Sequence, residues 1–220
     1  MAAITLYRQA GCGGRYIAES LARVLDYHLS DYLTVERILQ QYGLEQFKDL
    51  YGSVPDFWER FTRKGVERDE INAMLRSVTL AEAHHGNVVM LGRGCFAPLQ
   101  GMCDVLNVRL KAPLPTRIGR IMNRLQITHD QAASFVEEKD LLVADFSKTS
   151  YGLSPDDVTL FDLVIDTSKV DLEMAVRWIV DAVGALKRSD DGEDTAAATL
   201  VDPIVAHLVS EEFHCSVTHS

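Results

Sequence analysis

Residues 4–21 read ITLYRQAGCGGRYIAESL and combine a short apolar strand, a glycine-rich turn and the start of an amphipathic helix. Within the turn, Gly11, Gly13 and Gly14 allow backbone conformations that other residues adopt only with strain. Such a turn directs several backbone N–H groups of the helix N-terminus toward one point, where the helix dipole adds partial positive charge. The pattern predicts a phosphate-binding loop; the alternative is that the glycines only terminate the strand.

This loop lacks both side chains that a Walker A sequence, G-x-x-x-x-G-K-[ST], supplies for catalysis. Aligning Gly11 and Gly13 with the central and last glycines of that motif puts Arg8 at its first glycine. Gly14 then takes the place of the lysine, and Arg15 takes the place of the metal-binding hydroxyl. Arg15 can offer positive charge to a phosphate group but cannot ligate a metal. The loop therefore favours phosphate binding more than fast phosphoryl transfer.

Short apolar segments alternate with helical segments along the chain. The expected strands are residues 4–8, 27–30, 88–91, 105–110 and 160–165. The expected helices are residues 17–25, 67–85, 113–125, a segment beginning at the capping-box sequence 128–131, and 171–186. This alternation is typical of a parallel sheet with helices on both faces, whose ligands bind at the carboxyl ends of the strands. The pattern therefore predicts an α/β fold.

The composition fits a globular domain followed by an acidic segment. The chain is 47% hydrophobic and carries a net charge of −10, which argues against broad binding to nucleic acid. The first 187 residues hold 25 acids against 21 bases, whereas residues 188–220 hold seven acids against one base. We therefore expect one main domain over residues 1–187. Residues 188–220 are expected to be an acidic linker and a C-terminal extension of unknown role that could contact a protein partner.

The termini and cysteines favour a cytoplasmic location. The first residues are not expected to form a signal peptide, because no long apolar run follows a basic start, and no apolar run approaches the length of a membrane span. The four cysteines form no C-x-x-C pair and are expected to be reduced thiols. No metal site is expected, because the spacing of the C-terminal histidines and Cys215 matches no known ligand set. Cys12, at the helix N-terminus, is expected to have a lowered pKa; it is either a redox-sensitive thiol or a small residue that fills the turn.

Five segments form a further pattern: ITLYRQAGCGGRYIA at 4–18, LDYHLSD at 25–31, VMLGRG at 89–94, VRLKAP at 108–113 and LFDLVIDTS at 160–168. Through these segments, residues 3–186 resemble the cytidylate kinase-like family, a branch of the P-loop nucleoside monophosphate kinases. The resemblance implies a P-loop NTPase fold with three α/β/α layers and five parallel strands, a helical NMP-binding insertion over residues 32–64, and a lid over residues 126–152. The family loop commonly reads S-R-x-x-G-S-G-G-R and also has no lysine, so the absence of the lysine from this loop looks like a family trait.

The resemblance also implies roles for individual residues. The phosphate-binding residues are expected to be Gly11, Cys12, Gly13, Gly14, Arg15, Tyr16 and Arg117. The residues that bind the acceptor nucleotide are expected to be Asp31 and Arg93, and the catalytic residues are expected to be Arg15, Arg93 and Arg120. Asp31 also fits a helix cap, and Arg117, Arg120 and Arg124, which share a helix face, also fit a solvated surface.

Two segments depart from the family pattern. The G-R-D sequence of true cytidylate kinases is replaced by a sequence in which Gly94 follows Arg93. The lid motif D-x-x-R-x-x-Y is replaced by DLLVADF at residues 140–146, so Val143 stands in place of the arginine and Phe146 in place of the tyrosine. An arginine that reaches the transferring phosphoryl group can raise the rate by several orders of magnitude. Only Lys139 and Lys148 lie nearby in the sequence as substitutes.

Two functions remain open from the sequence. The first is an enzyme that transfers the γ-phosphoryl group of ATP to a nucleotide such as CMP, with Mg²⁺ held through the phosphates. The second is a nucleotide-binding module with weak or no catalysis, whose acidic C-terminal segment contacts a partner. The small-molecule partners are nucleotides in both cases.

Overall fold

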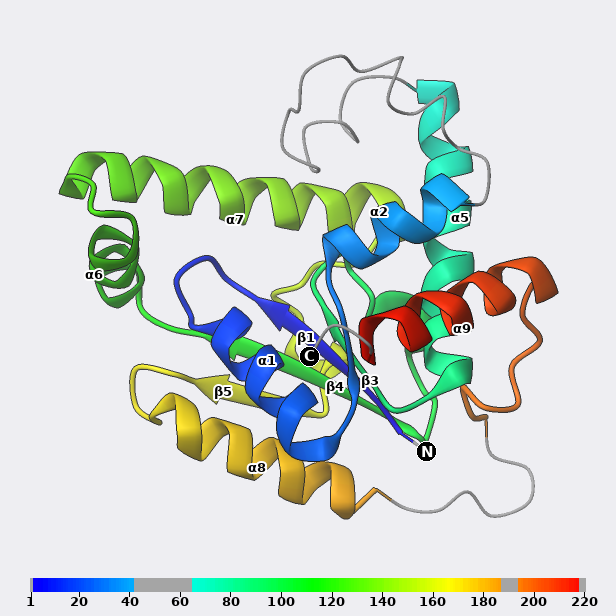
Figure 1. Cartoon of the computed structure of the whole chain (residues 1–220). Helices are drawn as coiled ribbons and strands as arrows, with labels where there is room; N and C mark the ends of the chain where they lie inside the picture. The colour runs from blue at the N-terminus through cyan, green and yellow to red at the C-terminus, as the bar shows by residue number, and fades with distance from the viewer. Residues whose placement is uncertain (1, 42–64, 187–193, 218–220) are drawn as a thin grey trace.

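A five-stranded parallel sheet forms the centre of the computed structural model, which describes residues 2–41, 65–186 and 194–217 (Figure 1). Its strands are β1 (Ala3–Arg8), β2 (His28–Ser30), β3 (Val88–Leu91), β4 (Val105–Lys111) and β5 (Leu163–Asp166). They lie in the order β2-β3-β1-β4-β5. The order places the glycine-rich turn that follows β1 at the middle of the sheet, between its two halves.

Most residues of β1, β3 and β4 are buried because helices cover both faces of the sheet. In β3, Val88 and Met90 belong to one buried cluster, whereas Val89 and Leu91 belong to another on the opposite face. The same alternation holds in β1, where Ala3 belongs to the first cluster and Ile4 belongs to the second. The predicted three-layer P-loop fold is confirmed.

Two helices cover one face of the sheet: α1 (Gly14–Leu25) and, along the lower edge of the view in Figure 1, α8 (Leu172–Gly184). They pack against each other and against the sheet through Ile17, Leu21 and Ile179, none of which is exposed. Helix α8 begins where the Asp171 side chain accepts a hydrogen bond from Met174 N. This layer fixes the direction of α1 and thereby of the turn that precedes it.

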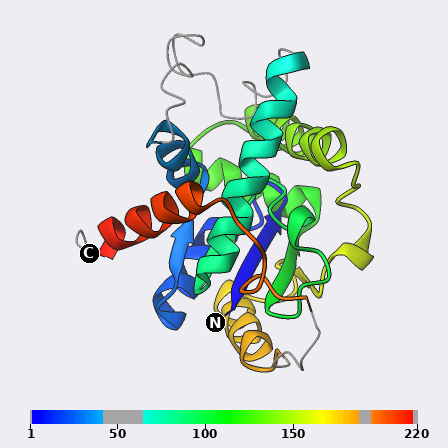
Figure 2. The ribbon, with the colours of Figure 1, turned by 90° about the vertical axis from the view of Figure 1, so that its right-hand side faces the viewer.

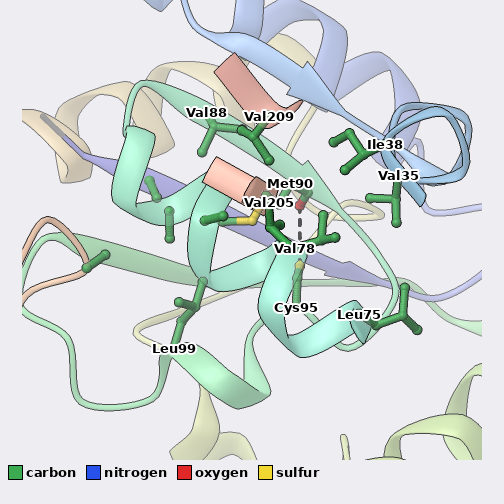
Figure 3. Packing of buried hydrophobic residues seen from close by; sticks show 14 of the residues in the cluster. Val35, Ile38, Leu75, Val78, Val88, Met90, Cys95, Leu99, Val205 and Val209 are labelled. Carbon is green, nitrogen blue, oxygen red and sulfur yellow. Dashed lines mark hydrogen bonds between the residues drawn. The ribbon is translucent and has the colours of Figure 1, made fainter. Parts of the chain in front are cut away.

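Three helices form the opposite layer: α2 (Tyr32–Gln41), α5 (Gly65–His85) and α9 (Pro203–Val217). In Figure 2, α9 lies beside α5 over the sheet. Their apolar side chains meet those of β3 in one cluster, shown in Figure 3. Val205 and Val209 of α9 take part in this cluster, so the described part of the C-terminal segment contributes to the core.

The last turns of α9 also contact the edge of the sheet. Phe213, which is 1% exposed, stacks on the ring of His28 in β2 with ring centroids 4.5 Å apart and planes at 9°. The ring of His85 meets Phe213 edge-on at 5.1 Å. Glu212 of the same helix forms an ion pair with Arg37 at 2.6 Å. Aromatic stacking and an ion pair therefore attach α9 to β2, α5 and α2.

The predicted lid region is helical. Helix α6 (Leu114–Leu125) is followed by α7 (His129–Tyr151), which spans roughly 34 Å at 1.5 Å per residue and crosses the top of the view in Figure 1. The predicted capping box is confirmed, because the Thr128 side chain accepts from Gln131 N and the Gln131 side chain accepts from Thr128 N. The two helices pack together around Ile121 and Val136.

Several predicted boundaries differ from the structure. Strand β5 begins three residues later than expected, because Asp157 caps a 3₁₀ turn, Val158–Leu160, by accepting from Thr159 N. Strand β2 begins at His28, because Asp26 ends α1 in a left-handed conformation with φ 55°. Residues 42–64, most of the predicted insertion, lie outside the described residues. Within the described ranges, no helix has both the length and the apolar character needed to cross a membrane.

Candidate nucleotide-binding site

A cavity of about 420 Å³ opens at the carboxyl ends of β1 and β3, between the glycine-rich turn, the start of α2 and the middle of α7. Its lining residues are Arg8, Gln9, Ala10, Gly11, Gly13, Gly14, Arg15, Tyr16, Asp31, Tyr32, Leu91, Arg93, Arg124, Phe135, Lys139 and Val143. Five of these carry a positive charge and one a negative charge. The cavity therefore favours an anionic ligand.

The glycine-rich turn is built so that side chains are excluded from two of its positions. Gly11 has φ +85°, and a Cβ atom there would lie 2.7 Å from the carbonyl oxygen of Arg117. Gly13 has φ +80°, and a Cβ atom there would lie 2.8 Å from the Leu172 methyl groups. Both glycines are thus required by left-handed backbone and by close packing. The turn leads into the N-terminus of α1, where free backbone N–H groups can bind a phosphate.

We expect Gly11→Ala to lower the free energy of unfolding by about 2–4 kcal/mol, because it adds left-handed strain to a contact with backbone atoms that cannot yield. Urea unfolding followed by circular dichroism measures this change. Gly119→Ala is the matched control, since Gly119 lies within α6 with no atom within 4 Å of an added Cβ. An unchanged midpoint in Gly11→Ala would show that the turn adopts another conformation in solution.

Asp31 has two roles in the structure. Its Oδ1 accepts hydrogen bonds from Leu33 N at 2.9 Å and Thr34 N at 3.3 Å, so it caps α2. Its Oδ2 accepts from Arg15 Nη1 at 3.2 Å, and Arg15 also pairs with Glu19 at 2.8 Å. Asp31 and Arg15 both line the cavity. The cap expected as an alternative is therefore present, together with a pairing that holds Arg15 at the cavity wall.

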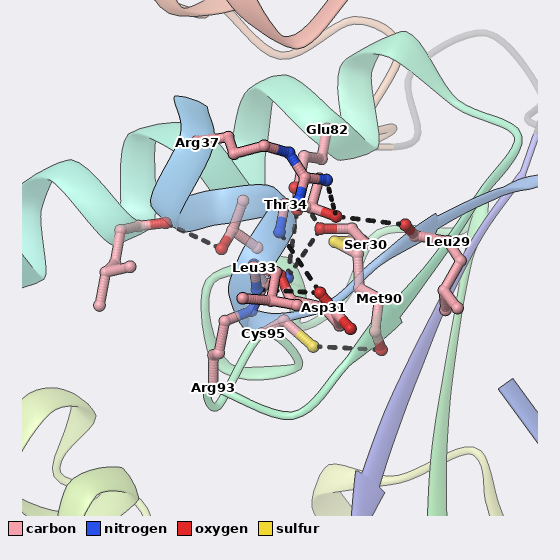
Figure 4. Close-up of polar contacts among 12 residues, drawn as sticks. Leu29, Ser30, Asp31, Leu33, Thr34, Arg37, Glu82, Met90, Arg93 and Cys95 are labelled. Carbon is pink, nitrogen blue, oxygen red and sulfur yellow. Dashed lines mark hydrogen bonds and ion pairs between the residues drawn. The ribbon is translucent and has the colours of Figure 1, made fainter. Parts of the chain in front are cut away.

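Arg93 is held by a buried network that sequence reasoning did not identify. Its guanidinium, 3% exposed, donates to Asp31 O, Ser30 Oγ and Glu82 Oε2 at 3.2–3.3 Å (Figure 4). Glu82, on α5, is fully buried and also accepts a hydrogen bond from Ser30 Oγ. Burial raises the pKa of Glu82, and the charge of Arg93 opposes that rise. These hydrogen bonds and the ion pair with Glu82 hold the Arg93 side chain in place at the end of β3, where the Arg93 backbone is left-handed with φ 60°.

Arg117 and Arg120 do not line the cavity, although both were expected at the nucleotide. Arg117 is 6% exposed and donates to Ala112 O, to Ala10 O and to Asp140 Oδ2 at 2.5 Å. Arg120 donates to Gly11 O at 3.4 Å and to both oxygens of Thr167. Both guanidinium groups therefore support the turn from behind by binding its carbonyl oxygens.

The cations that reach the cavity from α6 and α7 are instead Arg124 and Lys139. Phe135 and Val143 of α7 complete that wall. Lys139 lies 5.7 Å from the ring centroid of Phe135. Helical spacing placed the three α6 arginines on one face, but it did not reveal which of them the turn would engage.

The expected lowering of the Cys12 pKa is wrong, and the structure fits the alternative, a small residue that fills the turn. The side chain is completely buried, and burial raises its pKa to about 11. The charge of Arg117 and the hydrogen bond with Gln9 lower that pKa, but their effects are smaller than the effect of burial. Cys12 also does not line the cavity, so its side chain packs into the core beneath the turn.

We therefore expect Cys12 to resist alkylation by iodoacetamide in the folded protein at pH 8, three units below its pKa, where the thiol is protonated. Reactivity should increase only as the pH approaches 11. Mass spectrometry of peptides after a timed reaction measures this. Cys103, which is partly exposed, provides the comparison, and urea-unfolded protein shows that every thiol can react. Rapid labelling of Cys12 at pH 8 would contradict the buried placement.

The residues around the cavity do not form a metal site of their own. Among the described residues, no group of three or more histidine, cysteine, aspartate or glutamate side chains could hold a metal ion. The Walker A hydroxyl is replaced by Arg15, and the oxygens of Asp31, the one carboxylate among the described lining residues, already bind Arg15 and the α2 backbone. The described lining residues thus do not fit a resident Mg²⁺.

Comparison with known proteins gives consistent results. The family model described as the cytidylate kinase-like family matches residues 3–169. A cytidylate kinase of Methanocaldococcus jannaschii is 32% identical over 132 residues, which cover 59% of this chain and 74% of the relative. An uncharacterized protein from Eubacterium ventriosum has a similar crystal structure, with a TM-score of 0.66 and 18% identity over 84% of this chain and 98% of that one. A shikimate kinase from Bacteroides thetaiotaomicron has a TM-score of 0.50 and 15% identity over 83% of this chain and 98% of that one.

Proposed function

Because the chain belongs to the cytidylate kinase-like family, we propose that it transfers the γ-phosphoryl group of ATP to a nucleoside monophosphate, with CMP as the acceptor. The observation that carries the proposal is the cavity, where the glycine-rich turn at the N-terminus of α1 meets five cationic side chains. A nucleoside triphosphate and a nucleoside monophosphate are both polyanions that such a cavity attracts.

In this proposal the residues act by positioning and electrostatics. The backbone N–H groups of the turn bind the donor phosphates, and Arg15 adds charge beside them. Arg93 binds the acceptor phosphate, and Asp31 sets the position of Arg15 and of the α2 N-terminus. Arg124 and Lys139 on the opposite wall neutralise charge on the transferring group. Magnesium enters as a counter-ion of the phosphates, since the described residues around the cavity offer no ligand set.

A second function is favoured by the α7 wall. Val143, which stands where the family lid carries an arginine, lines the cavity and packs in a cluster with Tyr7, Phe96 and Phe161. No cationic side chain is present at this position to stabilise the transferring phosphoryl group. This supports a nucleotide-binding protein with slow or no turnover.

One experiment separates the two functions. Purified protein is mixed with ATP and Mg²⁺ and each of CMP, dCMP, UMP and AMP, and diphosphate products are measured by chromatography. Calorimetry under the same conditions measures binding. Formation of CDP supports the kinase, whereas binding without product supports the second function. If neither ATP nor any monophosphate binds, both are wrong.

Arg15→Ala should weaken nucleotide binding by about tenfold if the guanidinium contacts phosphate, because charge-assisted hydrogen bonds contribute about 1.5–3 kcal/mol. Arg177→Ala is the matched control, because Arg177 is exposed on α8 and does not line the cavity. An equal loss in both variants would mean that general surface charge, and not this site, attracts the nucleotide.

A further inference from the structure

Arg8, the last residue of β1, extends into the cavity and has no assigned role. Its aliphatic stem passes beside Gly14, where an added Cβ atom would lie 3.0 Å from Arg8 Cγ and Cδ. Its guanidinium ends beside Gly92, where an added Cβ atom would lie 2.5 Å from Arg8 Nη1. The side chain therefore lies along the turn, in space that two glycines leave for it.

The guanidinium of Arg8 lies among other cations. Burial lowers its pKa, and the nearby charges of Arg93 and Arg15 lower it further. Arg93 is neutralised by Glu82, and Arg15 by Asp31 and Glu19. For Arg8, by contrast, no hydrogen bond or ion pair occurs with any residue that the structure describes. A partly buried cation with no carboxylate partner in the described part of the chain, at the wall of a cavity, is complementary to an anion that enters the cavity.

The side chain of Arg8 lies where the missing Walker A lysine would begin. Gly14 occupies the Walker A lysine position, and the space that a lysine stem would need at Gly14 is filled by the stem of Arg8. A guanidinium adds what an ammonium lacks, since its planar N–H groups can bind two phosphate oxygens at once. The cation that the motif places on the first turn of the helix is thus supplied from the end of the preceding strand.

We propose that Arg8 is the phosphate-binding residue that replaces the loop lysine and contacts the terminal phosphates of a nucleoside triphosphate. The identity of this ligand rests on the proposed function, whereas the anion site itself rests on the geometry of Arg8. One consequence is mutual exclusion: a lysine at position 14 and an arginine at position 8 compete for the same space, so either cation can serve but not both.

Four variants test the exchange: Arg8→Met, which keeps the aliphatic stem, Arg8→Ala, Gly14→Lys, and the double variant Arg8→Ala/Gly14→Lys. Calorimetry measures the binding of ATP and of inorganic tripolyphosphate, and thermal unfolding confirms that each variant is folded. Both single Arg8 variants should bind tripolyphosphate about 10–100-fold more weakly, the range expected for a charge-assisted contact. The double variant should recover affinity to within about fivefold of the original protein, whereas Gly14→Lys alone should lower the unfolding temperature because its side chain meets the Arg8 stem.

The outcomes separate this inference from the proposed function. If tripolyphosphate binding depends on Arg8 but no diphosphate forms from ATP, the anion site at Arg8 is supported and the proposed kinase function is wrong. If diphosphate forms and Arg8→Met does not change its rate, the proposed kinase function is supported and the role of Arg8 is wrong. Affinity within twofold of the original protein in Arg8→Met, no recovery in the double variant relative to Arg8→Ala, or no tripolyphosphate binding by the original protein would each overturn the inference.

Discussion

Glu82→Leu is expected to lower the free energy of unfolding by about 3–5 kcal/mol, because it leaves the buried guanidinium of Arg93 without its carboxylate. Glu82 is fully buried and Arg93 is 3% exposed, so the lost carboxylate leaves its partner in a site with little access to water. The pair also holds Ser30, whose hydroxyl contacts both side chains. Urea unfolding followed by circular dichroism measures the loss.

The double variant Glu82→Leu/Arg93→Leu is the control for this experiment. Replacing a buried ion pair by apolar side chains is often neutral or stabilising, so the double variant should recover most of the lost stability. It should still bind nucleotide more weakly, because Arg93 lines the cavity. A loss below about 1 kcal/mol in Glu82→Leu would mean that Arg93 finds solvent or another partner, contrary to the observed burial.

Phe213→Ala is expected to lower the free energy of unfolding by about 3–5 kcal/mol, the usual cost of removing a fully buried aromatic ring. The ring is 1% exposed and contacts His28 and His85, so its removal leaves a cavity between α9, α5 and the edge of the sheet. Chemical unfolding measures the change. The result decides whether residues 203–217 are part of the folded domain.

Ile204→Ala is the matched control on the same helix, since Ile204 is 59% exposed and should change stability by less than about 0.5 kcal/mol. If Phe213→Ala behaves like this control, α9 does not pack on the domain in solution. If Phe213→Ala is strongly destabilised, α9 belongs to the folded domain, and the division into a main domain and a separate extension does not describe the chain.

Local pattern was enough to predict the sheet, the glycine-rich turn and the helices α1, α5, α6, α7 and α8, because each rests on residues close in sequence. Helix α2 lies in the segment expected as a helical insertion, and α9 was not among the expected helices. The turn could be identified from Gly11 and Gly13, whose left-handed backbone is a property of the residues themselves. The capping box at Thr128 was predictable for the same reason. Boundaries moved where a single capping side chain, such as Asp157, redirected the backbone.

The polar partners of the site could not be derived in this way. Arg117 and Arg120 share a helix face as predicted, but which face meets the turn depends on how α6 packs against a loop 107 residues earlier in the chain. Glu82 did leave a signal, since it lies four residues after Val78 and seven after Leu75 on the buried side of its helix. An acid on an apolar helix face indicates a buried partner, but not which of the chain's arginines it binds.

The contacts of Asp140 link the wall of the cavity to its floor. This carboxylate, on α7, accepts from Ala10 N in the glycine-rich turn and from Arg117, which itself donates to Ala10 O. A displacement of α7 that widened the cavity would have to break these hydrogen bonds or carry the turn along with it. The entrance to the cavity and the shape of its phosphate-binding floor are therefore mechanically coupled. The conformation of the glycine-rich turn that a phosphate meets depends on the position of α7.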